Sequence, residues 1–169
     1  MGFVEAIKVC LRKYANFSGR ARRPEYWWFV LFVALATLVA TLIDVAIWGT
    51  AETAVRILGP IVQLALMLPL FAVGWRRLHD SGRPGWYLLL PMLLGIATAL
   101  ALLLGVAVFG SMEAHGVPSE ELRGPAGVLG SVSMVLVGIL QLVLTLLMLW
   151  WLTRPTDPQP NRFGPPPPA

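Results

Sequence analysis

Residues 76–86 read Arg-Arg-Leu-His-Asp-Ser-Gly-Arg-Pro-Gly-Trp and separate two long apolar stretches. The flanking residues 57–75 and 86–112 contain no charged side chain. Gly82, Pro84 and Gly85 favour a tight reversal, and a charged turn at the end of an apolar segment must contact headgroups or water. The stretch therefore predicts a turn between two membrane-spanning helices, and it concentrates much of the chain's polar chemistry.

The composition is that of an integral membrane protein. Hydrophobic residues make up 57% of the 169 positions and charged residues 13%, whereas soluble domains carry about 25% charged residues. Segments of roughly 20 apolar residues can cross a bilayer core, and four are long enough: 26–48, 57–75, 86–109 and 128–152. We predict an all-α fold, a four-helix membrane bundle over residues 1–152 with an extended Pro-rich tail of little fixed structure over 153–169.

The first residues predict a short amphipathic helix lying on the membrane surface. Apolar side chains recur at helical spacing on one side, at Phe3, Val4, Ile7, Leu11 and Tyr14. Charged side chains occupy the other side, at Glu5, Lys8 and Arg12. A mobile leader is the alternative, but a basic amphipathic segment directly before a span has anionic lipid within reach, which favours the interfacial helix.

Asp44 is the only acid within the predicted spans. An ionisable group inside a bilayer is by default a functional candidate. Its position 18 residues after Tyr26 corresponds to about 27 Å of helix, close to the far interface. We therefore interpret Asp44 as a boundary residue, and we expect Pro69 to kink the second span.

The distribution of cations predicts the orientation. Only Arg56 and Arg123 lie on one side of the predicted spans, and the other eleven lie opposite, at Lys8, Arg12, Lys13, Arg20, Arg22, Arg23, Arg76, Arg77, Arg83, Arg154 and Arg162. Cytoplasmic segments of membrane proteins carry the excess of Lys and Arg. Both termini and the turn at 76–86 are therefore expected in the cytoplasm.

Three polar segments are thus expected on one face, and each carries a motif. The motifs are Phe17-x-Gly19-Arg20-x-x-Arg23-x-Glu25-Tyr26-Trp27, then Arg77-Leu78-His79-Asp80-x-Gly82-x-x-Gly85-Trp86, and finally Asn161-Arg162-Phe163-Gly164. In these motifs the chain resembles the small bacterial inner-membrane proteins known as domain of unknown function 805. The resemblance covers nearly the whole chain, except that the usual glycine-rich lead-in to the last motif is replaced by residues 157–160. It implies a bacterial inner membrane and a four-span fold, and it implies no activity.

We expect these segments to form one polar cluster on the cytoplasmic face. Its candidate residues are Arg20, Arg23, Glu25, Trp27, Arg76, Arg77, His79, Asp80, Trp86 and Asn161. Within it, Asp80 is expected to pair with Arg20 or Arg23, and Glu25 with Arg76 or Arg77. Such pairs stabilise the protein when they are partly buried, because removing one partner leaves an uncompensated charge.

The cluster does not predict an enzyme. A single His79-Asp80 pair supplies too few metal ligands, and Cys10 and His115 complete no zinc spacing. Glu25 and Asp80 are candidates for an acid/base pair, but the neighbouring arginines favour a structural network. We expect no catalytic residue, no metal and no cofactor.

Two non-enzymatic classes remain. A transporter or channel component needs polar groups near the bilayer midplane, and the spans offer only Thr, Ser and Gln there. An interaction or structural module needs only the face rich in Arg and Trp, which suits anionic phospholipid or an acidic partner. We favour the module. Its expected partners are the lipid bilayer and a membrane protein or a second copy of the chain, and no nucleic acid.

Overall fold

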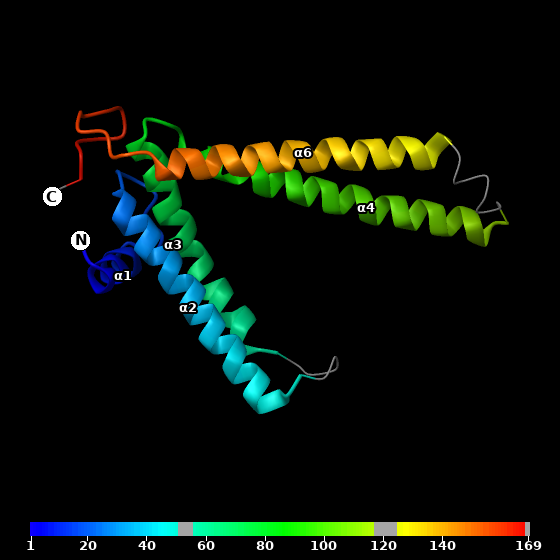
Figure 1. Cartoon of the computed structure of the whole chain (residues 1–169), viewed down its shortest axis with the longest axis horizontal. Coiled ribbons are helices and arrows are strands. Elements are labelled where there is room, and N and C mark those ends of the chain that lie inside the picture. The colour runs from blue at the N-terminus through cyan, green and yellow to red at the C-terminus, as the bar shows by residue number, and fades with distance from the viewer. Residues whose placement is uncertain (51–55, 117–124, 168–169) are drawn as a thin grey trace. The chain divides into compact units, whose positions relative to one another are not determined.

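The computed structural model describes the whole chain except residues 51–55, 117–124 and 168–169. Its elements are α1 (Phe3–Arg12), α2 (Arg23–Trp48), α3 (Leu58–Asp80), the 3₁₀ turn η1 (Gly85–Leu89), α4 (Leu90–Ala114) and α6 (Pro125–Thr153) (Figure 1). Four stretches are long and apolar enough to cross a membrane, namely Arg23–Trp48, Leu58–Asp80, Gly85–Val108 and Val132–Thr153. The predicted all-α membrane fold is confirmed. Residues 51–55 and 117–124, which lie between predicted spans, are outside the described residues.

The chain divides into two compact units. Unit 1 comprises Met1–Leu88 and Trp151–Ala169, and unit 2 comprises Leu89–Trp150. In unit 1, α2 packs along α3, and α1 packs against α2 and, less extensively, against α3 (Figure 1). The grouping of all four spans in a single domain stays a prediction.

The start of α2 follows from its local sequence. Arg22 is extended and precedes the helix, and Pro24 occupies the first turn, where its missing N–H leaves no hydrogen bond unmade. Glu25 lies in the same turn, where the helix dipole favours an acid. One turn further along α2, Phe29 forms a small core with Val73 of α3, Cys10 and Ala21. This core holds the first turns of α2 beside the last turns of α3.

Asp44 connects the far ends of α2 and α3. It is buried, and its carboxylate accepts hydrogen bonds from the first backbone N–H groups of α3, at Ile57 (3.3 Å), Leu58 (3.0 Å) and Gly59 (2.7 Å). These N–H groups have no partner within their own helix. The acid that stood out in the apolar sequence therefore caps the neighbouring helix.

Helix α1 packs through its smallest side chains. Ala6 and Cys10 are fully buried, whereas Val4 and Leu11 of the predicted apolar stripe are exposed. Small residues allow close approach of the two backbones, so the packing face differs from the stripe of large apolar residues. Val4 and Leu11 remain exposed, whereas Phe3 at the start of the stripe packs edge-on against Trp28.

Pro69 leaves one carbonyl of α3 without its usual partner. The carbonyl of Ala65 lies four residues earlier, where an ordinary residue at position 69 would donate its N–H. The hydroxyl of Tyr14 donates to this carbonyl instead. Tyr14 thus fixes the end of α1 against α3.

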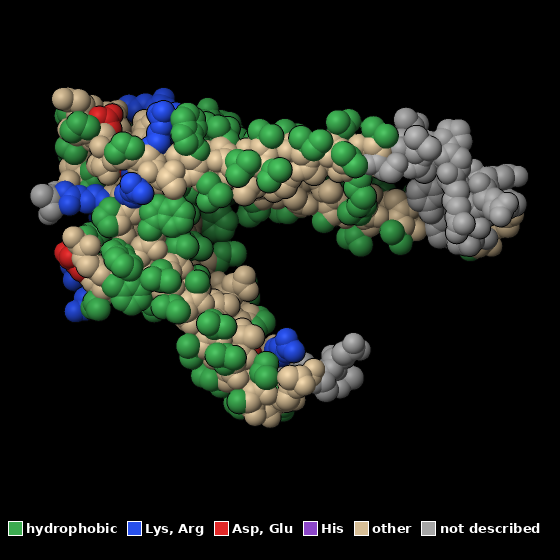
Figure 2. Space-filling model, in the orientation of Figure 1, with side chains coloured by type: hydrophobic (Ala, Val, Ile, Leu, Met, Phe, Trp, Pro, Cys, Tyr) green, Lys and Arg blue, Asp and Glu red, His purple; other side chains and the backbone are tan. Residues whose placement is uncertain are grey.

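Unit 2 consists of α4 and all but the last turn of α6, which lie side by side (Figure 1). Gln141 donates from Nε2 to the carbonyl of Pro91 across the pair (3.1 Å), and Thr98 donates to Leu94 within its own helix (2.8 Å). Most of the described side chains are apolar and exposed, as Figure 2 shows by its hydrophobic colour along both helices. Such surfaces are expected of helices that face lipid.

Candidate functional site

The end of α3 turns sharply because two glycines permit it. Gly82 has φ +74°, in the left-handed region, and the N–H of Arg83 donates to the carbonyl of Leu78 (3.0 Å), which closes the helix. Gly85 lies against the indole of Trp75, and a Cβ there would approach the ring to 2.2 Å. The turn predicted from residues 76–86 is therefore present. It ends α3 at Asp80 and places Gly85 of the following chain against Trp75 of α3.

Charged and imidazole side chains are buried at this end of unit 1. We call them the buried network, and each is 8% exposed or less: Arg20, Glu25, Arg76, Arg77, His79 and Asp80. They come from the segment before α2, from its first turn and from the last turns of α3. Buried charges on this scale require partners, because isolated burial of an ion is strongly unfavourable.

Asp80 is the centre of the first group of contacts. Arg20 donates from Nε to Oδ1 of Asp80 (2.9 Å), and its Nη2 lies 2.8 Å from the same oxygen. Arg77 donates from Nη1 to Oδ2. Both carboxylate oxygens are thus occupied, and the predicted pairing of Asp80 with Arg20 is confirmed.

Glu25 is the centre of the second group. Arg76 donates from Nη1 to Oε1 of Glu25 (2.7 Å), which confirms the predicted pair. The thiol of Cys10 lies 3.9 Å from the same Oε1. Burial, and then the negative charge of Glu25, raise the pKa of this thiol from its ordinary 9.0 to about 12. Cys10 is therefore a neutral packing residue rather than a reactive thiolate.

Arg77 also binds the end of α6. Its Nε donates to the carbonyl of Leu152 (3.1 Å), and its Nη2 donates to the carbonyl of Arg154. The last carbonyls of a helix lack partners and carry a partial negative charge. A single guanidinium thus joins Asp80 of α3 to the last turn of the C-terminal helix.

The tail is held by Arg20. Its Nη1 donates to the carbonyl of Gln159 (2.7 Å), and its Nη2 donates to the carbonyl of Asp157. These acceptors lie in residues 157–160, where the resemblance described above implies a glycine-rich lead-in. Backbone carbonyls are offered by any sequence, so the replaced segment still supplies acceptors. The proline content of the tail predicts little fixed structure. This prediction is wrong for Asp157 and Gln159, whose carbonyls bind Arg20.

The closing motif packs on His79. The Phe163 ring stacks on the imidazole, with centroids 3.9 Å apart and planes 3° apart, and Asn161 donates from Nδ2 to the carbonyl of His79 (3.0 Å). On the ring's edge, Nδ1 lies 3.1 Å from the carbonyl of Gly19. His79 is therefore a packing and hydrogen-bonding platform for the tail.

The predicted polar cluster divides into two groups. Arg20, Glu25, Arg76, Arg77, His79, Asp80 and Asn161 are joined by the contacts above, whereas Arg23 and Trp86 are exposed and Trp27 packs edge-on against Tyr26 (5.3 Å). Sequence reasoning missed the roles of the tail carbonyls. Phe163 is part of the closing motif but is not among the residues predicted for the polar cluster.

Exposed cations form the outer surface of the same end. They include Lys8, Arg12, Lys13, Arg23, Arg154 and Arg162, and Figure 2 shows Lys and Arg side chains gathered there. Trp28 and Trp86 are exposed as well. Within the described residues no group of three His, Cys, Asp or Glu side chains could hold a metal ion. What this end offers chemically is a positive and aromatic surface over the buried network.

Comparison with known proteins gives one family. The sequence pattern of the family described as "Protein of unknown function (DUF805)" matches residues 14–165. The inner membrane protein YhaH of Escherichia coli K12 is 36% identical over 119 residues, which cover 70% of this chain and 92% of that protein. The inner membrane protein YhaI of the same organism is 39% identical over 80 residues, which cover 47% of this chain and 64% of that protein. No solved structure matches the chain.

Proposed function

Because the chain belongs to the DUF805 family of inner membrane proteins, we propose that it is a non-enzymatic interaction module of the bacterial inner membrane. In this proposal the buried network shapes a cytoplasmic face, and the exposed cations and tryptophans of that face meet anionic lipid or an acidic partner segment. Both termini lie in the cytoplasm. The excess of Lys and Arg at this end supports that orientation.

One observation carries the proposal, namely that the acids of this end are buried and paired whereas most of its cations are exposed. Glu25 and Asp80 are buried and paired with arginines. Lys8, Arg12, Lys13 and Arg23 remain at the surface. The two acids of the cluster that could serve as proton-transfer groups are thus engaged in the fold, and the charge that surrounds them at the surface is mainly positive.

An exposed cationic face has a defined use at a membrane. Each Lys or Arg near an anionic leaflet contributes about 1 kcal/mol of attraction. Trp28 and Trp86 add amphipathic rings, which favour the headgroup layer. The combination supports contact with headgroups or with an acidic protein segment, and it requires no chemistry.

A transporter component is the alternative, and the described spans support it less. Asp44 accepts three N–H groups at the start of α3, so it is not free to bind a solute. Thr98 donates to its own helix and Gln141 donates to Pro91. Proton-coupled transport depends on ionisable groups within the spans, and the side chains of Thr98 and Gln141 do not ionise.

The test is the composition of what the protein retains from its native membrane. The full chain is purified in mild detergent, and bound lipids and proteins are quantified by mass spectrometry. We expect anionic phospholipid, or an acidic protein, to be enriched over its share in the membrane. A variant with Lys8, Arg12, Lys13 and Arg23 changed to Gln should lose that enrichment while still inserting. Equal retention by both proteins would refute the proposal.

A further inference from the structure

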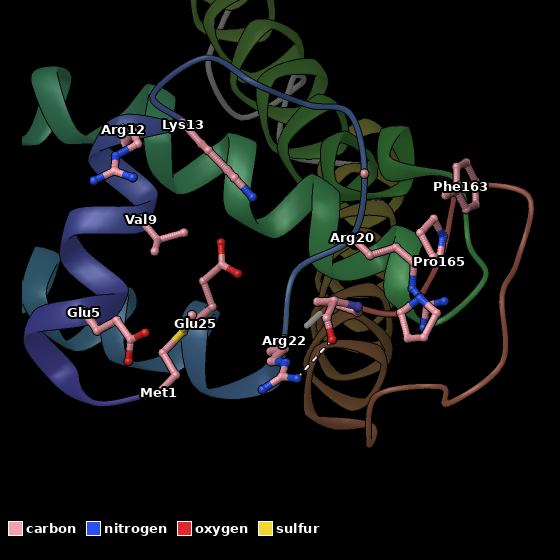
Figure 3. Close-up of a pocket in the computed structure, with 13 residues that line it drawn as sticks. Met1, Glu5, Val9, Arg12, Lys13, Arg20, Arg22, Glu25, Phe163 and Pro165 are labelled. Carbon is pink, nitrogen blue, oxygen red and sulfur yellow. Dashed lines mark hydrogen bonds between the residues drawn. The ribbon is translucent and has the colours of Figure 1, made fainter. Parts of the chain in front are cut away.

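A pocket lined by both charged and apolar side chains opens between α1, the segment before α2 and the tail (Figure 3). Its volume is about 470 Å³, within the range of about 300 to 1,000 Å³ usual for small-ligand sites. All of its walls belong to unit 1. Val9 of α1 and Pro165 to Pro167 of the tail supply apolar wall, and the charged side chains come from α1, the residue after it and residues 20–25.

The charges around this pocket do not balance. Among the described residues, four cationic side chains line it, Arg12, Lys13, Arg20 and Arg22, against two acidic side chains, Glu5 and Glu25, an excess of two positive side-chain charges. The charge imbalance is larger when residues already in ion pairs are left out of the count. Arg20 is paired with Asp80 and Glu25 with Arg76, which leaves three cations facing the single carboxylate of Glu5.

Glu5 itself is turned toward its own helix. Its Oε2 accepts from the N–H of Gly2 (3.3 Å), at the start of α1. Arg22 donates from Nη2 to the carbonyl of Pro167 (2.9 Å), a neutral acceptor. Figure 3 shows Lys13 extending from the end of α1 toward Glu25, with Arg22 on the opposite side of that acid. Lys13 and Arg22 thus face the pocket, and neither forms an ion pair with an acid in the part of the chain that the structure describes.

We propose that this pocket binds the phosphate of an anionic phospholipid headgroup. A phosphate oxygen bound to a guanidinium forms a charge-assisted hydrogen bond, which is stronger than the bond that Arg22 makes with a neutral carbonyl. Arg22 immediately precedes the candidate span Arg23–Trp48, and Glu25 is its third residue, so the pocket lies at the level where headgroups begin. The apolar wall of Val9 and the prolines suits the glycerol and the first carbons of an acyl chain.

This inference rests on the proposed function and makes it specific. The proposed function requires only that the positive face attracts anionic lipid or an acidic protein segment. The pocket adds that two of the lining cations, Lys13 and Arg22, matter more than cations elsewhere on the same face. Lys8 provides the matched comparison, because it lies on α1, is exposed and does not line the pocket.

The experiment is native mass spectrometry of the full chain in nonionic detergent. Dioleoylphosphatidylglycerol and dioleoylphosphatidylcholine are titrated separately, and inorganic phosphate is added as a competitor. Wild type is compared with Lys13→Gln, Arg22→Gln and Lys8→Gln, and a thermal melt of each variant confirms that it is folded. We expect phosphatidylglycerol to bind in preference to phosphatidylcholine. A charged hydrogen bond lost from a site weakens binding about tenfold or more, so we expect that change for Lys13→Gln and Arg22→Gln. Lys8→Gln removes only an exposed charge of the same face, so we expect a smaller weakening, of about fivefold at most.

Each other outcome overturns the inference in a distinct way. Equal weakening by all three variants would show attraction to the whole face, which refutes the pocket and leaves the proposed function standing. Displacement of the lipid by inorganic phosphate at matched concentration would show that the ligand is a free phosphate. No preference for phosphatidylglycerol in wild type would refute the pocket, and lipid retention from native membrane then decides the proposed function separately.

Discussion

Arg20 and Asp80, 60 residues apart in the chain, form a buried ion pair with Nη2 of the arginine 2.8 Å from Oδ1 of the acid. The same guanidinium donates to carbonyls of Gln159 and Asp157 in the tail. One side chain therefore joins the segment before α2, the end of α3 and the C-terminal residues. Only arginine has a planar fork that can donate in three directions at once.

Arg20→Lys should release the tail while it retains the positive charge. Lysine can still meet Asp80, but its single ammonium group cannot also reach both tail carbonyls. Limited trypsin digestion measures the effect, because Arg162 is exposed and is followed by Phe163. We expect cleavage after Arg162 to be several-fold faster than in wild type.

The control for this change is Arg23→Lys, which alters an exposed arginine of the same segment. It should leave the rate of tail cleavage unchanged. Equal cleavage rates in Arg20→Lys and wild type would show that the tail is held without the arginine fork.

Much of this arrangement follows from the sequence, and the reasons are physical. The lengths of the apolar segments predict the helices, because backbone N–H and C=O groups in lipid must hydrogen-bond to one another. Gly82 and Gly85 mark the turn after α3. Glu25 and Asp80 were expected to pair with arginines, because an unpaired buried charge is strongly unfavourable. These arguments predict that Asp80 pairs with Arg20 or Arg23 and that Glu25 pairs with Arg76 or Arg77. The structure shows Arg20 and Arg76 as the partners.

Other contacts could not be predicted because they involve backbone carbonyls. Arg77 binds the carbonyl of Leu152, and Tyr14 binds that of Ala65. Every residue carries a carbonyl, so no side-chain pattern marks the acceptor. The residue at position 69 gives a partial signal, because a proline leaves the carbonyl four residues earlier without its partner. Which side chain fills that position depends on how α1 packs.

Asp44→Ala should destabilise the protein. The change removes the acceptor for three N–H groups at the start of α3. Leaving a buried donor unsatisfied costs about 1 to 3 kcal/mol. Thermal unfolding in detergent should show a clear drop in Tm, and Asp44→Asn, which retains one acceptor oxygen, should show a smaller one. If the two variants melt like wild type, Asp44 is not the cap that we describe.

The reactivity of Cys10 should depend on pH in an unusual range. Burial, and next the charge of Glu25, raise its pKa to about 12, and only the thiolate reacts with iodoacetamide. Alkylation of the folded protein should therefore be slow at pH 9 and still be rising above it. Protein unfolded in dodecyl sulfate should titrate near the ordinary value. A plateau near pH 9 in the folded protein would contradict the buried placement.

The same shift has a defined sign for stability. The folded protein holds the Cys10 proton more tightly than the unfolded chain, so this contribution to stability is complete below pH 9.0 and is lost as the pH rises through about 12. Cys10→Ala should remove this dependence. The comparison of the two proteins by thermal unfolding across that pH range isolates the thiol.

The orientation can be tested with single cysteines in a Cys10→Ala background. Thr50 follows α2 and His115 follows α4, so each is exposed one span away from the network, and Ser18 is exposed beside the network. If the termini are cytoplasmic, an impermeant maleimide should label Thr50→Cys and His115→Cys in spheroplasts and should label Ser18→Cys only after lysis. Labelling of Ser18→Cys in intact spheroplasts would reverse the orientation.

The central claim is that the buried network is structural and that binding belongs to the exposed cations. Asp80→Asn tests it most directly, because the change leaves Arg20 and Arg77 buried without their counter-charge. Breaking such a pair costs about 3 to 5 kcal/mol. Two quantities are measured on this variant. The first is its Tm in detergent, with and without added anionic lipid, and the second is its binding to anionic liposomes. We predict a lower Tm that anionic lipid does not restore, and unchanged liposome binding by the folded protein. An unchanged Tm with stronger binding to anionic liposomes would contradict the account.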